Sequence, residues 1–178
     1  YYKSIIKFDE ERMYDFIYYF APFVFSDSKE IIYDSVKGFI YGKAQSVENL
    51  ENMVEYNTKF INLVKQDPIK RVNELKNIIK TDSKAYIYYN LGLSYAQIND
   101  FTNAYKNFEK AYKLSPGNKL YSVMYLITAN KISADMPDKQ RAILDKNIKD
   151  SGGLYSYFGK ELYKLFINSG YNVVETAQ

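Results

Sequence analysis

Apolar residues recur at helical spacing in two neighbouring segments near the middle of the chain. In the first segment, Leu91 and Tyr95 lie four residues apart and so share one face of a helix. The second segment carries a longer stripe, made of Phe101, Ala104, Phe108, Ala111 and Tyr112. Asp100 lies between them, where its side chain can cap the second helix, and Ser115-Pro116-Gly117 ends that helix. The pattern predicts a helical hairpin with a very short turn over residues 85–118.

A similar frame returns downstream. Tyr155, Phe158, Gly159 and Leu162 have the same spacing as Tyr88, Leu91, Gly92 and Tyr95. The two glycines lie 67 residues apart, close to twice the length of a 34-residue unit. Residues 119–151 are therefore expected to hold a degenerate hairpin, with helices over 119–131 and 138–149. Residues 152–178 are expected to hold the first helix of a further repeat or a C-terminal capping helix.

The pattern weakens toward the start of the chain. Residues 46–84 predict a divergent hairpin, in which Ser46 caps a long first helix and Asp67-Pro68 starts the second. Residues 1–45 form an aromatic-rich segment, with helices expected over residues 9–20 and 28–41. The same stretch is also rich in residues that favour strands. Helices are favoured there because every later segment is helical.

The central hairpin resembles the tetratricopeptide repeat (TPR), a 34-residue helical hairpin with a fixed pattern of small and large residues. The matching positions are Tyr88, Leu91, Gly92, Tyr95, Ala104, Phe108, Ala111 and Pro116. Only Tyr88 departs from the pattern, because the family has Trp there. The resemblance implies an all-α fold, a TPR-type α-solenoid of antiparallel helical hairpins with about nine helices. It also implies that Gly92 lies against the second helix, near Ala104 and Phe108.

The amino-acid composition limits the kinds of functional site that the chain can form. The 178 residues include no Cys and no His, which removes thiolate metal sites and the commonest general base. Acidic runs such as residues 9–11 are typical of helix N-termini, and the glycines match no phosphate-binding loop. We therefore expect no enzymatic activity, no cofactor and no bound metal.

Charge and aromatic content bear on the partner. The net charge is +3 with acidic and basic residues interspersed, so nucleic-acid binding has no support. The longest apolar run, residues 16–25, is about half of what a membrane-spanning helix needs, so no direct membrane insertion is expected within this segment. The chain has 20 Tyr and 11 Phe, crowded near its start. Some of these aromatics are expected to face a partner or a neighbouring domain.

The TPR resemblance also implies a binding groove, lined by the first helix of each hairpin. The implied groove positions are Tyr86, Tyr89, Asn90, Leu93, Gln97, Leu120, Val123, Ile127 and Lys131. Members of the family that grip a C-terminal carboxylate use Lys and Asn where Tyr89 and Leu93 stand here, which disfavours that function. An apolar groove suits an amphipathic helix or an extended apolar segment. We expect Tyr86, Tyr89 and Leu93 to be partly exposed, and Tyr88, Leu91 and Tyr95 to be buried.

The function expected from these observations is a protein–protein interaction scaffold or adaptor that binds a helical or extended apolar segment of a partner. By analogy with large bacterial TPR proteins, the setting is an envelope or flagellar-motor assembly, with the periplasm favoured over the cytoplasm. A TPR chaperone for secreted or assembling proteins is the alternative. Self-association through exposed aromatics or open solenoid ends is also consistent with the pattern.

Overall fold

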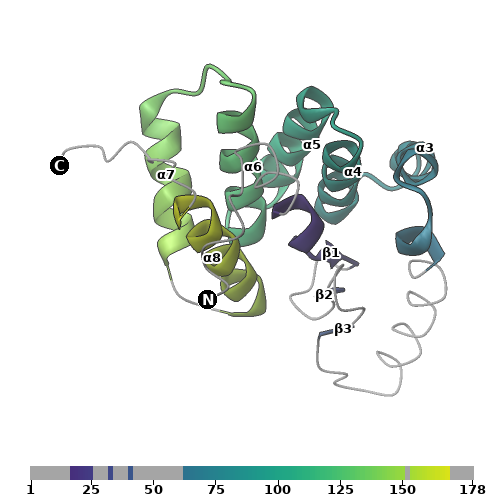
Figure 1. Cartoon of the computed structure of the whole chain (residues 1–178), viewed down its shortest axis with the longest axis horizontal. Helices are drawn as coiled ribbons and strands as arrows, with labels where there is room; N and C mark the ends of the chain where they lie inside the picture. Colours follow the sequence, from purple (N-terminus) through teal and green to yellow (C-terminus); the bar gives the residue numbers. More distant parts are fainter. Residues whose placement is uncertain (1–16, 26–31, 34–39, 42–61, 151–152, 169–178) are drawn as a thin grey trace, which may run out of the picture.

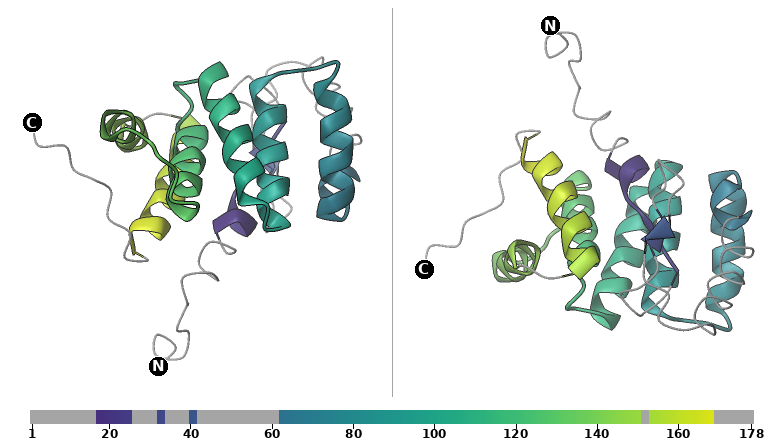
Figure 2. Two further views of the ribbon diagram at one scale, coloured as in Figure 1. Left: turned by 90° about the horizontal axis from the view of Figure 1, so that it is seen from above. Right: turned by 90° about the horizontal axis from the view of Figure 1, so that it is seen from below.

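The computed structural model describes residues 17–25, 32–33, 40–41, 62–150 and 153–168. Six helices within these residues run from α3 to α8, and residues 17–20 and 62–65 are helical as well. Their bounds are α3 Pro68–Ile79, α4 Ala85–Gln97, α5 Phe101–Leu114, α6 Lys119–Lys131, α7 Asp138–Lys149 and α8 Gly153–Asn168. Figure 2 shows the helices side by side, from α3 at one end of an array to α7 and α8 at the other.

Polar side chains start several of these helices. Asp67 accepts a hydrogen bond from the Ile69 backbone N–H at 2.8 Å and precedes Pro68, the first residue of α3. Asp100 caps α5 through the Asn103 N–H at 3.1 Å, as the sequence predicted. Asn118 caps α6 in the same manner. Short polar residues thus fix the positions at which these helices begin.

The turn between α4 and α5 is built on one left-handed residue. Asn99 has a φ of 62°, a conformation that Asn tolerates better than most residues. The N–H of Asn99 donates to the Ala96 carbonyl and that of Asp100 donates to the Tyr95 carbonyl, so the last carbonyls of α4 are satisfied. Because the turn is this short, α4 and α5 pack as an antiparallel hairpin.

Burial divides the helices into two groups. In α4 and in α6, ten of thirteen residues are buried, whereas α5 buries three of fourteen and α7 two of twelve. A helix that is apolar all round is expected to lie in the interior, and an amphipathic one outside it. Therefore α4 and α6 form the inner row of the array and α5 and α7 the outer row.

Two glycines allow close approach between helices. A Cβ placed on Gly92 would lie 2.8 Å from the Phe108 ring and 3.2 Å from the Ala104 carbonyl oxygen, which confirms the contact expected from the repeat pattern. A Cβ on Gly159 would lie 3.1 Å from the Lys119 carbonyl oxygen. Gly159 thus serves the packing of α8 against the start of α6, a different contact from that of Gly92.

The first part of the chain departs from the all-helical expectation. Three short strands, β1 Phe23–Val24, β2 Ile32–Tyr33 and β3 Ile40–Tyr41, form an antiparallel sheet in the order β1-β2-β3. Phe23 pairs with Tyr33, and Ile32 pairs with Tyr41. The three strands lie next to one another in Figure 1. The helix expected over residues 28–41 is therefore wrong. Aromatic and β-branched residues at these positions favour strand pairing, and the backbone of β1 is held extended by α4.

The helices expected elsewhere agree with the structure where it describes the chain. The helices α6 and α7 have the bounds expected from the sequence, and residues 17–20 are helical as expected. The all-α solenoid fold is confirmed, with the three-stranded sheet as an addition at its start. The helices expected from Ser46 to residue 61 and over residues 9–16, and the turn at residues 169–178, lie outside the described residues.

Candidate functional site

The face of α4 that was expected to line a groove is covered by the chain itself. Residues 17–25, which we call the N-terminal segment, lie across one face of the helical array (Figures 1 and 2). The Val24 N–H donates to Asn90 Oδ1 at 3.0 Å, and Asn90 Nδ2 donates to the Val24 carbonyl at 2.7 Å. The Tyr89 hydroxyl donates to the Pro22 carbonyl at 2.7 Å. Helix α4 therefore binds an extended segment mainly by its backbone.

Aromatic packing holds the helical start of the segment. The Tyr18 ring stacks on Phe108 with 6.4 Å between centroids and an interplanar angle of 4°. Its hydroxyl lies 2.7 Å from Thr128 Oγ1 in α6. Because the Thr128 hydroxyl donates its proton to the Met124 carbonyl, the Tyr18 hydroxyl must be the donor. Tyr18 thus joins α5 to α6.

The exposure expected along α4 is wrong. Tyr86, Tyr89 and Leu93 were expected to be partly exposed, but all three are buried. Tyr88 and Tyr95 were expected to be buried, but both are only half-buried. Leu91 is buried as expected. The physical reason is that the N-terminal segment covers the groove side of α4, which leaves the aromatic rings of the repeat pattern nearer the outer surface.

The groove positions of α6 are also mostly inside the protein. Leu120, Val123 and Ile127 are fully buried. Lys131 is half-buried, and its Nζ lies 5.0 Å from the centre of the Phe101 ring, a cation–π distance. Tyr89 and Tyr121 stack with 5.1 Å between ring centroids, so α4 and α6 meet directly there. The apolar groove positions of α6 therefore belong to the core, in a helix that packs against α5, α7 and α8.

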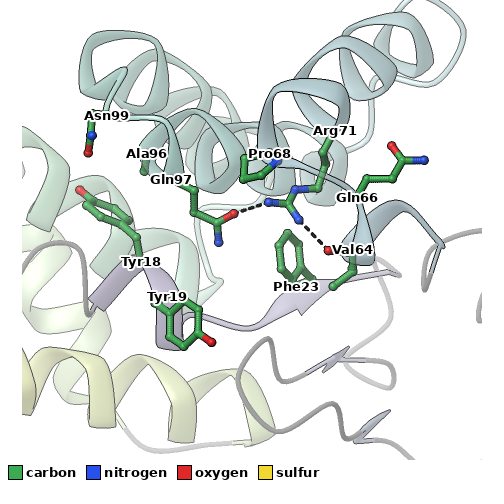
Figure 3. A pocket seen from close by; sticks show the side chains of 10 residues that line it. All are labelled: Tyr18, Tyr19, Phe23, Val64, Gln66, Pro68, Arg71, Ala96, Gln97 and Asn99. Carbon is green, nitrogen blue, oxygen red and sulfur yellow. Dashed lines mark hydrogen bonds between the residues drawn. The ribbon is translucent and has the colours of Figure 1, made fainter.

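A cavity of about 440 Å³ opens at the C-terminal end of α4. Its walls come from residues 18–23 of the N-terminal segment, from the start of α3 and the residues before it, and from the last turn of α4 (Figure 3). The lining residues are Tyr18, Tyr19, Phe23, Val64, Gln66, Pro68, Arg71, Ala96, Gln97 and Asn99. Gln97 is the groove position from the sequence that lies in this cavity.

Arg71 in α3 provides the only positive charge among the described residues that line this cavity. Its Nε donates to Ser94 Oγ at 2.9 Å, one terminal nitrogen donates to the Val64 carbonyl at 2.8 Å, and the other donates to Gln97 Oε1. The guanidinium also lies 4.9 Å from the centre of the Phe23 ring. Arg71 therefore ties α3, α4 and β1 together through neutral partners.

The environment of Arg71 disfavours its charge. The side chain is 4% exposed, and no carboxylate lies within ion-pair distance of it among the described residues. Burial lowers the pKa of the Arg71 guanidinium to about 10, and the negative charge of Asp67 partly opposes this shift by raising it. At neutral pH the guanidinium stays charged, so the cavity holds a fixed cation.

One buried polar atom of the cavity has no partner. Among the described residues, Gln66 Oε1 is buried and makes no hydrogen bond. In Figure 3 Gln66 lies on the far side of Arg71 from Gln97. An unsatisfied buried acceptor costs free energy, so Gln66 Oε1 can still accept a hydrogen bond on this side of the guanidinium.

Sequence reasoning missed both Arg71 and the occupant of the groove. Arg71 falls in the stripe of Leu75 and Ile78, spaced by four and seven residues, so its position on the inner face of α3 was visible in the sequence. The aromatic crowding at residues 16–25 was a signal for a binding segment. Its target could not be read, because Val24 and Asn90 lie 66 residues apart in the chain.

The inner and outer helical rows define the class of protein as an α-solenoid of helical hairpins. Residues 85–118 match the family model of the tetratricopeptide repeat, and the chain is a protein that contains this repeat. No curated protein matches the chain. Tetratricopeptide repeats mediate protein–protein interaction and are typically non-catalytic.

The described residues offer neither a metal-binding cluster nor a membrane-spanning helix. In the described part of the chain, no group of three or more acidic, His or Cys side chains is placed to hold a metal ion. Over the same residues, none of the helices combines the length and the apolar character needed to cross a bilayer.

Proposed function

We propose that the protein is an interaction module, a scaffold or adaptor, whose groove binds extended apolar segments through their backbone. The observation that carries the proposal is the pair of hydrogen bonds between the Asn90 amide and the Val24 peptide group. A side-chain amide that accepts from the N–H and donates to the carbonyl of one residue recognises the backbone of that residue and not its side chain. Such a contact suits any extended segment with apolar side chains.

The N-terminal segment is then the resident occupant of a groove that can exchange it. Tyr89 adds a third backbone contact at Pro22, two residues before Val24. The ring of Phe23 meets Arg71, and the Tyr18 ring meets Phe108. A partner segment of similar character would compete for the same contacts, so the resident segment tunes the affinity of the groove for partners.

The setting we propose is a scaffold within a larger assembly, and the likeness of its composition to large bacterial TPR proteins points to the envelope or the flagellar motor. The packing of α8 against the start of α6 supports the scaffold, because helices stacked in this way build a repeating array. A groove filled by the chain itself favours this function over that of a chaperone, which needs its groove open to clients.

The proposal is tested by binding a peptide in trans. Val24→Pro in the full chain removes the N–H that donates to Asn90 and weakens the resident segment while leaving the groove intact. A fluorescent peptide of residues 15–27 with two added lysines should then bind this variant with measurable anisotropy change. The unmodified chain should bind the same peptide more weakly, because its groove is occupied.

Two controls make the result specific. A peptide that carries proline at the position of Val24 should lose most of the binding, and so should the full chain with Val24→Pro combined with Asn90→Ala. Far-UV circular dichroism checks that each variant keeps its helices. Equal binding of the two peptides, or no effect of Asn90→Ala, would contradict backbone recognition by the groove.

A further inference from the structure

We propose that the cavity at the C-terminal end of α4 binds a carboxylate group, held by the Arg71 guanidinium and the Gln97 side-chain amide. This site is separate from the backbone contacts of the groove, and nothing in the repeat pattern assigns it. We assign the carboxylate to a polypeptide, and this assignment rests on the proposed interaction function. The presence of the carboxylate site does not rest on that function.

The first step of the argument is the unused donor capacity of Arg71. A guanidinium carries five N–H donors, and Arg71 uses three of them on Ser94, Val64 and Gln97. All three acceptors are neutral, so the positive charge itself is not neutralised by them. Two N–H donors have no partner among the described residues. A carboxylate is the group whose planar pair of oxygens best matches guanidinium donors.

The second step is the orientation of Gln97. Its Oε1 accepts a hydrogen bond from Arg71, so the NH₂ group of the same amide must point the other way. Figure 3 shows the amide nitrogen directed away from Arg71, toward Tyr19. No hydrogen bond ties this nitrogen to another of the described residues. The hydrogen bond with Arg71 therefore orients the Gln97 NH₂ group, which is a second donor, toward the open part of the cavity.

The third step is the absence of negative charge among the described residues that line the cavity. These ten residues include one cation and no carboxylate. Asp67, whose negative charge acts on Arg71, caps α3 through the Ile69 N–H. At the end of α4, the Tyr95 and Ala96 carbonyls, which would repel an anion, accept hydrogen bonds from the turn at Asn99 and Asp100. The cavity thus offers a buried guanidinium, two directed donors and room for a side chain or a chain terminus.

Because Tyr18, Tyr19 and Phe23 form one wall of the cavity, the site exists only while the N-terminal segment is docked. Carboxylate binding and docking of the segment should therefore reinforce each other. A partner that offers a carboxylate would bind the docked state, whereas a partner that competes for the groove would abolish the site. The two proposals can consequently fail independently of each other.

The test uses the ¹⁵N-labelled full chain and small carboxylates. N-acetylphenylalanine supplies a C-terminal carboxylate, and N-acetylglutamic acid α-amide supplies an acidic side chain. N-acetylphenylalanine amide and N-acetylglutamine amide are the uncharged counterparts. The carboxylates should shift the Gln97 side-chain NH₂ and Arg71 Nε–H resonances saturably, and the amides should not. The acid that saturates at lower concentration identifies the source of the group. Equal shifts from acids and amides, or no saturable shift, would overturn the proposal.

A variant supplies the second readout. Gln97→Glu places a carboxylate against Arg71 from within the chain, so added carboxylate should bind at least about tenfold more weakly while the fold is kept. Gln140→Glu in α7 makes the same chemical change away from the cavity and should bind as the parent does. If Gln97→Glu does not fold, Gln97→Met removes the donor without adding charge and should weaken binding in the same direction. Parent-like binding by a folded Gln97 variant would refute the site.

Discussion

Asn90 in α4 and Val24 in β1 exchange two hydrogen bonds, in which one side-chain amide satisfies both the N–H and the carbonyl of a single peptide residue. Both residues are buried, so neither group of Val24 can turn to water instead. This contact joins the N-terminal segment to α4. It holds the segment over the groove side of α4, and the proposed binding of partner segments uses the same Asn90 amide.

Asn90→Ala should destabilise the protein by about 2–5 kcal/mol, because two buried backbone groups lose their partner and each costs about 1–3 kcal/mol. Urea unfolding measures the change, and hydrogen exchange of the Val24 amide locates it. Asn107→Ala in α5 is the matched control, since Asn107 bonds only to the Asn103 carbonyl one helical turn away. It should change stability by less than about 0.5 kcal/mol. Equal effects of the two variants would mean that the Val24 contact contributes little.

Gly92→Ala should overpack the hairpin. The added Cβ would lie 2.8 Å from the Phe108 ring, and Phe108 is fully buried and cannot move aside freely. We expect a loss of about 1–3 kcal/mol, and a larger loss for Gly92→Leu. Gly117→Ala is the control, because nothing lies within 4 Å of its added Cβ. A thermal melt of Gly92→Ala that matches the parent would show that Phe108 does not pack against Gly92.

The contacts that the sequence predicted are those within a repeat. Gly92 and Phe108 are sixteen residues apart, and helical periodicity with a short turn brings them together without knowledge of the rest of the chain. The caps Asp67 and Asp100 were readable for the same reason, since each acts on residues two or three positions away.

The contacts that could not be predicted are those that cross between repeats and the N-terminal segment. Val24 meets Asn90 through a tertiary contact that no periodicity encodes, and the strand of Phe23 and Val24 depends on that contact. Tyr89 was expected to be partly exposed, but it is fully buried. The burial of Tyr89 is set by a segment whose place in the fold is a long-range property.

Tyr89 provides a test that separates packing from hydrogen bonding. Its side chain is fully buried, with the Phe108 centroid at 5.7 Å, and its hydroxyl bonds to the Pro22 carbonyl. Tyr89→Ala should cost about 3–5 kcal/mol, as truncation of a buried aromatic does. Tyr89→Phe should cost about 1–2 kcal/mol, because only the hydrogen bond is lost.

Tyr157→Ala is the control for the truncation, since that side chain is 60% exposed, and it should cost less than about 1 kcal/mol. Chemical unfolding of the four proteins gives the comparison. If Tyr89→Ala kept the stability of the parent, Tyr89 would be an open groove residue as first expected, and the docking of the N-terminal segment would be wrong.

The last prediction concerns alkaline pH and Tyr125 in α6. Burial raises the pKa of the Tyr125 phenol, and a hydrogen bond with Tyr105 and the negative charge of Glu109 raise it further. In the unfolded chain the same phenol ionises near its ordinary value of about 10. The folded state therefore holds this proton at a pH where the unfolded state releases it. Stability from this group is complete below about pH 10 and falls as the pH rises above that value.

Tyr125→Phe removes the ionising group and should make the free energy of unfolding fall less steeply above pH 10 than it does in the parent. Urea unfolding at a series of pH values from 8 to about 11 gives the two slopes. Tyr157→Phe controls for the loss of one hydroxyl on an exposed ring. Because Tyr125 packs between Tyr105 and Tyr112, with centroids at 5.3 and 5.5 Å, the variant keeps the ring contacts and changes only the hydroxyl. Equal slopes for the parent and Tyr125→Phe would mean that ionisation of the Tyr125 phenol does not lower the free energy of unfolding at alkaline pH.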